Sequence, residues 1–257
     1  MSDEKTSGIQ ETFISHLIEL RNRLVRASSV VLVMFFLLFS VWPGAAVLYD
    51  FMAQPMLQAL PEGSKMIATG VITPFMVPLK ITMVAALLVS LPWVLYQAWA
   101  FIAPGLYMHE KRLVAPLIIS STLLFIVGVG FCYYFVFGTV FKFISDFAPK
   151  SIAVAPDIEN YLDFILTMCL AFGLTFEVPV VVVVLVRMGV VSVEKLKSIR
   201  PYMIVGAFVI AAVVTPPDIM SQLFLAVPLC VLYEVGLLFA PLFVKATQAP
   251  EETTDSP

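Results

Sequence analysis

Long runs of apolar residues constrain this chain more than any other feature. An α-helix needs about 20 apolar residues to cross a hydrocarbon core of about 30 Å. Six candidate runs are present, near 24–42, 76–99, 113–141, 161–186, 201–214 and 219–240. In lipid every backbone polar group must be satisfied within the protein, and runs of this length achieve that as helices. The sequence therefore predicts an all-α, polytopic membrane protein with six transmembrane helices.

Composition supports a bilayer environment and argues against several other classes. Charged residues make up 13% of the 257 residues, against about 25% in an average soluble domain. There is no basic patch or stripe of the kind that nucleic-acid-binding proteins carry, so no nucleic-acid partner is expected. The three cysteines lie inside apolar runs, which favours buried thiols over a disulfide framework or a zinc site.

The last two candidate spans differ from the others in length. Pro201 to Val214 is 14 residues, or about 21 Å of helix, and the two prolines of "TPPD" at 215–218 cannot continue it. The sixth run extends only from Met220 to Tyr233 before Glu234. We therefore expect the fifth and sixth helices to be short, which would thin the bilayer locally or require partner helices.

The distribution of basic residues predicts the orientation. Eleven of the 15 Lys and Arg residues fall on the side that holds the N-terminus, 100–112, 187–200 and the C-terminal tail. By the positive-inside rule that side is cytoplasmic. The two larger connections on the other side, about 43–75 and 142–160, are expected to form ordered caps. We expect one domain over 1–241 and a disordered acidic tail over 242–257.

Catalytic motifs are missing from the sequence. It contains no H-E-x-x-H, no G-x-S-x-G and no G-x-x-x-x-G-K-[ST]. We therefore expect a protein that is not an enzyme, with no metal and no cofactor. Energy for any transport would have to come from a gradient or from a partner protein.

The N-terminal segment 12–27 has the pattern of an amphipathic helix that leads into the first span. Phe13, Leu17, Leu20 and Leu24 recur at helical spacing. Glu19 projects from another face, four residues before Arg23, where such a pair stabilises a helix slightly. The segment is either an interfacial helix alone or one that also uses Glu19 for recognition.

The stretch "AFIAPGLYMHEKRL" at 100–113 places one carboxylate, Glu110, between two apolar runs. It could be a solvated loop residue paired with Lys111 or Arg112. It could also receive a cation, because Phe101 and its apolar neighbours could form a wall beside it. Phe101 by itself could equally be an aromatic anchor at the membrane interface.

Glu177 is the strongest signal that the residues alone provide. It lies ten residues before Arg187, about 15 Å deep and near the bilayer midplane. An intramembrane carboxyl is a functional-site hypothesis by default, because its insertion costs about 2.5–3.5 kcal/mol. It is either a neutral residue hydrogen-bonded for structure or a group that meets water or a partner. Asp218 and Gln222 flank the junction of the fifth and sixth spans, where an aspartate is often a helix cap.

Five stretches of the sequence together resemble the TatC family, the core membrane subunit of twin-arginine protein translocation. They are "HLIELRNRL" at 16–24, "AFIAPGLYMHEKR" at 100–112, "FGLTFEVPV" at 172–180, "RPYMIVGAFVIAAVVTPPD" at 200–218 and "SQLFLAVPLCVLYEVG" at 221–236. The resemblance covers about 12–240 and is specific, since several separate motifs agree in order. It implies a concave, glove-like bundle in the bacterial inner membrane with both termini in the cytoplasm.

The resemblance also implies a function and its residues. Signal peptides with paired arginines, carried by folded proteins, would bind at Glu19, Phe101 and Glu110. TatA-like and TatB-like single-span proteins would be partners, with self-association in a complex, and the proton gradient would drive export. Glu177 and Gln222 correspond to intramembrane polar and partner-contact positions. Pro55 and Asp218 correspond to functional positions on the periplasmic side, although Pro55 alone would be interpreted only as a loop-shaping residue.

A second hypothesis follows from the residues without the resemblance. Glu177 could be the proton site of a proton-coupled small-solute transporter. The two hypotheses differ in whether the purified chain transports a solute by itself or binds peptides and single-span partners.

Overall fold

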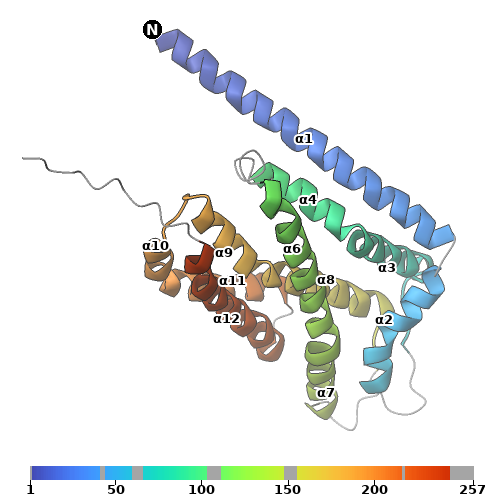
Figure 1. Ribbon diagram of the computed structural model, residues 1–257. Coiled ribbons are helices and arrows are strands. Elements are labelled where there is room, and N and C mark those ends of the chain that lie inside the picture. The colour runs from blue at the N-terminus through green and yellow to red at the C-terminus, as the bar shows by residue number, and fades with distance from the viewer. Residues whose placement is uncertain are drawn as a thin grey trace, which may run out of the picture.

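The chain folds into a bundle of helices, shown in Figure 1. A computed structural model describes residues 2–40, 44–59, 66–102, 111–147, 155–215 and 218–243. Four stretches in these ranges are long and apolar enough to span a membrane: Ile14–Ser40, Val114–Ile144, Ile158–Arg187 and Ile219–Leu242. A bent pair of helices makes a fifth, and one shorter apolar helix completes the set. The predicted class, an all-α polytopic membrane protein, is confirmed.

The first layer of the bundle consists of α1 (Ser2–Ser40) packed along α3 (Thr73–Val89) and α4 (Leu91–Ile102). Figure 1 shows α1 running alongside this pair. The axis bends by 63° between α3 and α4. Pro92, in the first turn of α4, has no N–H to donate to the carbonyl four residues earlier, which is the usual cause of such a kink. The second span is therefore a broken helix.

The second layer is built on two long composite helices. One runs through α6 (Lys111–Phe131), a five-residue π-helical segment η1 (Cys132–Val136) and α7 (Phe137–Phe147). The other consists of α8 (Ile158–Phe176) and α9 (Val178–Arg187). The main hydrophobic core lies between them and α3, with fully buried side chains that include Phe137, Leu162, Ile165, Met168 and Phe172.

Glycines let these two composite helices cross at short range. A Cβ on Gly128 of α6 would lie 2.6 Å from the Phe172 carbonyl oxygen of α8, and a Cβ on Gly173 would collide with the ring of Phe125. In a membrane, small residues promote helix association because lipid provides no hydrophobic drive between helices. This crossing holds the last turns of α8, just before Glu177, against α6.

The C-terminal part comprises α10 (Val193–Ser198), α11 (Arg200–Val214) and α12 (Ile219–Phe243). The fifth span, α11, has 15 residues, so the prediction that it is short is confirmed. The prediction for the sixth is wrong, because α12 has 25 residues and continues past Glu234. Glutamate is a good helix former, so it interrupts the apolar run without ending the helix; at the helix surface it accepts from Arg200 at 2.6 Å.

The two larger connections meet at one end of the bundle, as expected for ordered caps. The first contains α2 (Ala45–Ala59), which packs on α3, α7 and α8. Beyond it, Ile67 forms a parallel bridge with Asp157 of the second connection. Donation from the Thr69 hydroxyl and from the Asn160 and Glu159 amides holds the pKa of the Asp157 carboxyl below its ordinary value. The acidic tail predicted for 242–257 lies outside the described residues from 244 onward.

Charged groups join α3 to α8 close to this end. Lys80 donates to Glu159 at 3.1 Å and to Asp163 at 2.8 Å, and Thr73 donates to Glu159 at 2.9 Å. These side chains are part-exposed, so each pair contributes modestly. Their main effect is to set the position of α8 relative to the broken second span.

The glycine crossing gives the first prediction. Gly128→Ala should destabilise the protein by about 1–3 kcal/mol, because the clash is with a backbone carbonyl that cannot rotate away. The matched control is Gly130→Ala on the same helix, where an added Cβ meets nothing within 4 Å. Unfolding in mixed detergent micelles measures both free energies. Equal effects of the two substitutions would contradict the close crossing.

Candidate functional site

An aromatic contact connects α1 to the end of α4. The His16 and Phe101 rings stack with centroids 4.4 Å apart and an interplanar angle of 21°. Glu19 lies three residues after His16, on a neighbouring position of the same helix face. The contact thus places Phe101, one of the predicted binding residues, beside the turn of α1 that carries Glu19.

Glu19 itself forms an ion pair within α1. Arg23 donates to its Oε1 from Nε at 2.8 Å and from Nη2 at 2.6 Å. The Glu19 side chain is 42% exposed and that of Arg23 is 23% exposed. A pair of this kind on a helix surface is worth only about 0.3–0.5 kcal/mol, so a competing cation could replace Arg23 at little cost.

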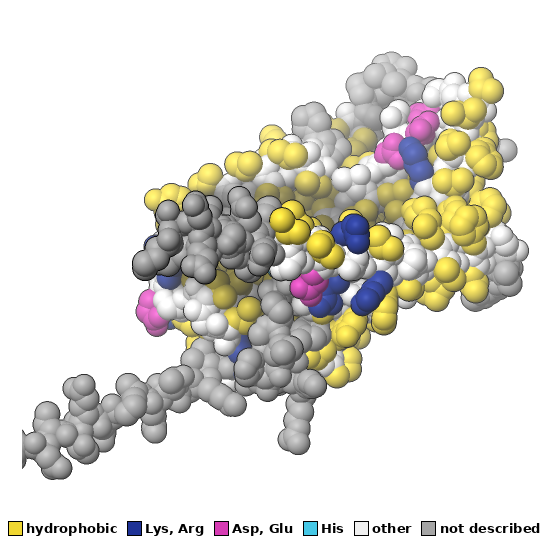
Figure 2. Space-filling model, turned by 90° about the horizontal axis from the view of Figure 1, so that it is seen from above, with side chains coloured by type: hydrophobic (Ala, Val, Ile, Leu, Met, Phe, Trp, Pro, Cys, Tyr) yellow, Lys and Arg dark blue, Asp and Glu magenta, His cyan; other side chains and the backbone are white. Residues whose placement is uncertain are grey.

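The surface around this pair is mostly polar. A shallow recess of about 270 Å³ runs along α1 beside Glu19 and is lined by Ser15, Ile18, Glu19, Asn22, Arg23 and Arg26. Figure 2, viewed from the α1 side, shows acidic and basic side chains close together among apolar ones. The recess presents the Glu19 carboxylate beside Ile18, with Arg23 and Arg26 also in its lining.

Glu110 lies outside the described residues, as do 103–109. The chain is described again from Lys111, the first residue of α6. The α4 and α6 helices on either side of this gap pack against each other. The predicted meeting of Glu19 and Glu110 therefore stays a prediction.

Glu177 occupies the break between α8 and α9. Its side chain is 6% exposed. Pro179 lacks the N–H that would bond to the Thr175 carbonyl, so the helix is interrupted here. Among the residues that the structure describes, neither carboxyl oxygen of Glu177 has a hydrogen-bond partner. Burial of a carboxyl without hydrogen bonds is costly to the fold.

A buried hydrogen bond lies next to Glu177. Trp99 Nε1 of α4 donates to Ser121 Oγ of α6 at 2.9 Å. The Ser121 hydroxyl faces the Glu177 carboxyl without reaching hydrogen-bonding geometry with it. On the other side, α12 approaches closely at Gly236, where a Cβ would lie 3.0 Å from Pro179 Cα. The α6 helix therefore lies beside the carboxyl, and α12 packs against the start of α9 two residues further on.

Asp218 and Gln222 organise the start of α12. The Asp218 Oδ1 accepts from the Ser221 amide at 2.7 Å, so it caps the helix. Gln222 donates through Nε2 to the Phe208 carbonyl of α11 at 3.3 Å. Asp218 thus starts α12 and Gln222 joins it to α11; a further role of either residue in function or in contacting partners stays a prediction.

Pro55 lies inside α2 and changes its hydrogen bonding. Because proline has no N–H, the carbonyl of Phe51, four residues earlier, lacks its helical donor. Tyr133 of η1 supplies one: its hydroxyl donates to this carbonyl at 2.6 Å. Tyr161 of α8 likewise donates to the Met52 carbonyl at 2.9 Å. Pro55 thus exposes a carbonyl through which α2 is attached to the core.

No sequence pattern singled out the side chains of four residues that the structure places at these sites: His16, Trp99, Ser121 and Tyr133. The proline inside α2 signals an unpaired carbonyl, but the residue that donates to that carbonyl is 82 residues away in the chain.

Among the described residues no group of three or more His, Cys, Asp and Glu side chains could hold a metal ion.

The fold is that of a multi-pass helical membrane protein with a broken span and one buried acid among its described residues. The family model for "Sec-independent protein translocase protein (TatC)" matches residues 15–228. The chain belongs to the TatC family.

Several relatives carry that description. The protein of Escherichia coli strain K12 is 45% identical over 98% of this chain and 95% of its own length. That of Haemophilus influenzae is 47% identical over 92% of both. That of Halothiobacillus neapolitanus is 49% identical over 92% of this chain, which spans less than two thirds (64%) of that protein's length. These relatives are named for protein transport and not for catalysis.

Solved structures agree with the family assignment. A crystal structure described as the twin-arginine translocase receptor TatC superposes with a TM-score of 0.77 and 36% identity, covering 89% of this chain and 99% of that one. A second, in the detergent DDM, gives 0.78 and 35% identity.

The Pro55 geometry yields a prediction about stability. Tyr133→Phe should cost about 0.5–1.5 kcal/mol, because the Phe51 carbonyl loses its donor. In a Pro55→Ala background the loss should be smaller, since the restored N–H at position 55 can serve that carbonyl. Tyr134→Phe, at the exposed neighbouring position, is the control. A double-mutant cycle measures the coupling, and equal costs of Tyr133→Phe in both backgrounds would refute it.

Proposed function

We propose that this protein is the receptor and core component of a twin-arginine protein translocase. Signal peptides of folded proteins bind on the cytoplasmic side of the bacterial inner membrane, where both termini lie. Single-span partners similar to TatA and TatB then assemble with the chain, and the proton gradient drives export. The observation that carries the proposal is the His16–Phe101 stack, which joins the Glu19 turn to the segment that leads to Glu110.

The chemistry of the paired arginines supports this site. A guanidinium is planar, permanently charged and matched to a carboxylate, so it can take over the position of Arg23 on Glu19. The intrahelical pair is weak because both side chains are part-exposed. The second arginine is assigned to Glu110, and the apolar part of the signal peptide continues along the bundle.

Peptide affinity tests the receptor role. Glu19→Gln and Glu110→Gln should each weaken binding of a twin-arginine signal peptide about tenfold, since a charge-assisted hydrogen bond is worth about 1.5–3 kcal/mol. Arg23→Gln should strengthen it about twofold, because the competing pair is removed. Glu194→Gln, an exposed glutamate of α10, is the control.

Binding to the protein in nanodiscs, with a lysine-pair peptide as the weaker ligand, gives these affinities. Unchanged affinity in the Glu19→Gln, Glu110→Gln double variant would rule out the receptor site. A weaker affinity in Arg23→Gln would show that Arg23 is part of the site and not a competitor.

For Glu177 we propose a hydrogen bond to a polar side chain on a single-span partner helix. Its burial without a described partner supports this, together with its position at a break in the span. A small-solute transporter would instead need the carboxyl to exchange a proton.

Two substitutions separate these roles. Glu177→Gln keeps a hydrogen-bonding group and should retain co-purification of single-span partners, whereas Glu177→Leu should lose it. Export activity should follow the same order. If Glu177→Gln abolished activity while partners remained bound, proton exchange would be required and the hydrogen-bond role would fail.

A further inference from the structure

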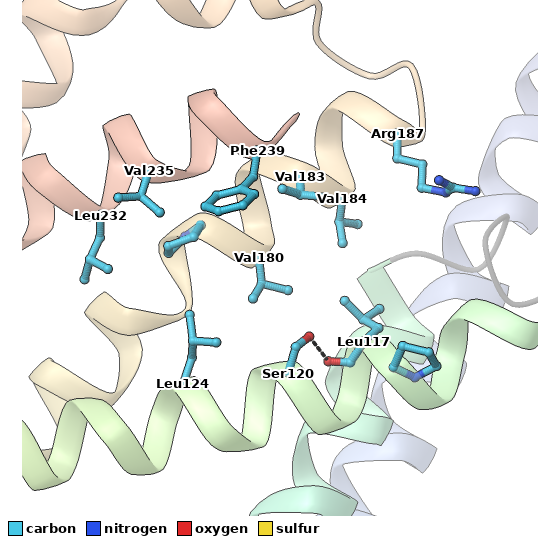
Figure 3. A pocket seen from close by; sticks show the side chains of 12 residues that line it. Leu117, Ser120, Leu124, Val180, Val183, Val184, Arg187, Leu232, Val235 and Phe239 are labelled. Atoms are coloured by element: carbon cyan, nitrogen blue, oxygen red, sulfur yellow. Dashed lines mark hydrogen bonds between the residues drawn. The ribbon is translucent and has the colours of Figure 1, made fainter. Parts of the chain in front are cut away.

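An apolar groove lies between α6, α9 and α12, apart from the α1 recess. Its volume is about 460 Å³. Figure 3 shows valine, leucine and phenylalanine side chains converging on it from the three helices. The lining consists of Pro116, Leu117, Ser120, Leu124, Pro179, Val180, Val183, Val184, Arg187, Leu232, Val235 and Phe239.

The lining of the groove includes two polar side chains, Ser120 and Arg187. Ser120, on the α6 wall, donates its hydroxyl back to the Leu117 carbonyl at 3.0 Å, so it offers the groove no donor. Arg187 is the one charged residue of the lining. Figure 3 shows its guanidinium at one end, directed outward from the apolar walls. The groove is therefore apolar along its length and basic at one end.

The basic end coincides with the end of the membrane spans. Arg187 is the last residue of the span Ile158–Arg187, Phe239 is close to the end of the span Ile219–Leu242, and Pro116 is close to the start of Val114–Ile144. An occupant would thus have its apolar part at membrane depth and its polar part at the surface. That is the geometry of one leaflet of a bilayer.

The volume distinguishes a lipid chain from a helix. A helix with its side chains is about 10–12 Å across, so 460 Å³ would hold only about one turn of it. A narrow, flexible hydrocarbon chain can use the whole length of the groove. Basic sites between transmembrane helices on the cytoplasmic side bind anionic lipid headgroups.

We propose that this groove binds an anionic phospholipid of the leaflet on the predicted cytoplasmic side. One acyl chain lies between α6, α9 and α12, and the phosphate contacts Arg187. A guanidinium has five N–H donors and can serve a phosphate together with a protein group. Lipid tails are already in an apolar medium, so the acyl chain contributes only shape complementarity to the groove. The headgroup contact is what makes the groove prefer an anionic lipid. The proposal does not depend on the receptor site.

Retention of lipid by the full-length protein tests this proposal. The probes are phosphatidylglycerol and phosphatidylcholine with identical acyl chains, counted by native mass spectrometry after detergent extraction. The unchanged protein should retain phosphatidylglycerol about fivefold more strongly, as expected for one basic residue near a headgroup. Arg187→Gln should abolish this preference while leaving retention of phosphatidylcholine unchanged.

Filling the groove gives the second arm. Val183→Phe should remove the retained lipid, whereas Val181→Phe, the same change on the exposed face of α9 outside the groove, should not. In the unchanged protein, a photoactivatable phosphatidylglycerol with its diazirine in the acyl chain should label peptides from residues 116–124, 179–187 or 232–239. Labelling that avoids these segments, or equal retention by the two phenylalanine variants, would overturn the proposal. Photocrosslinks from position 183 to a polypeptide in place of lipid would likewise assign the groove to a partner and overturn it.

Discussion

The need to satisfy every backbone hydrogen bond in a medium without water determines this structure. In hydrocarbon an unpaired N–H or carbonyl costs several kcal/mol, so an interrupted helix is tolerated only where other groups are packed against the break. The chain contains such interruptions at Pro92, at the π segment Cys132–Val136 and at Pro179. Pro55 produces the same situation in α2.

These interruptions are where the polar residues of interest lie. Pro179 places Glu177 at a break beside α6, and Pro55 exposes the Phe51 carbonyl to Tyr133. The bend before α4 directs its far end toward α1, where Phe101 meets His16. A continuous helix would use these backbone groups internally and offer no such attachment points. The same helix breaks therefore produce the irregular structure and the contacts on which the proposed function depends.

The free-energy cost of burying a charge explains where most of the charged side chains lie. The Glu19–Arg23, Lys80–Asp163 and Arg200–Glu234 pairs are all part-exposed, so they contribute little to stability and can exchange partners. Glu177 alone among the described acidic side chains is buried. The weak surface pairs suit reversible recognition, and the buried carboxyl suits a contact that requires exclusion of water.

The class of protein, its approximate spans and the residues worth examining were predictable from the sequence, because transfer of about 20 apolar residues into lipid depends on composition and length alone. The length of α12 was predicted wrongly, because a glutamate ends an apolar run in a hydropathy pattern but is itself a good helix former. Only the tertiary structure decided which residues meet: Phe101 with His16, Tyr133 with Phe51, Trp99 with Ser121, and α6 with α9 and α12 around the groove. Such contacts join residues far apart in the chain, and they depend on helix crossing geometry that no local pattern encodes.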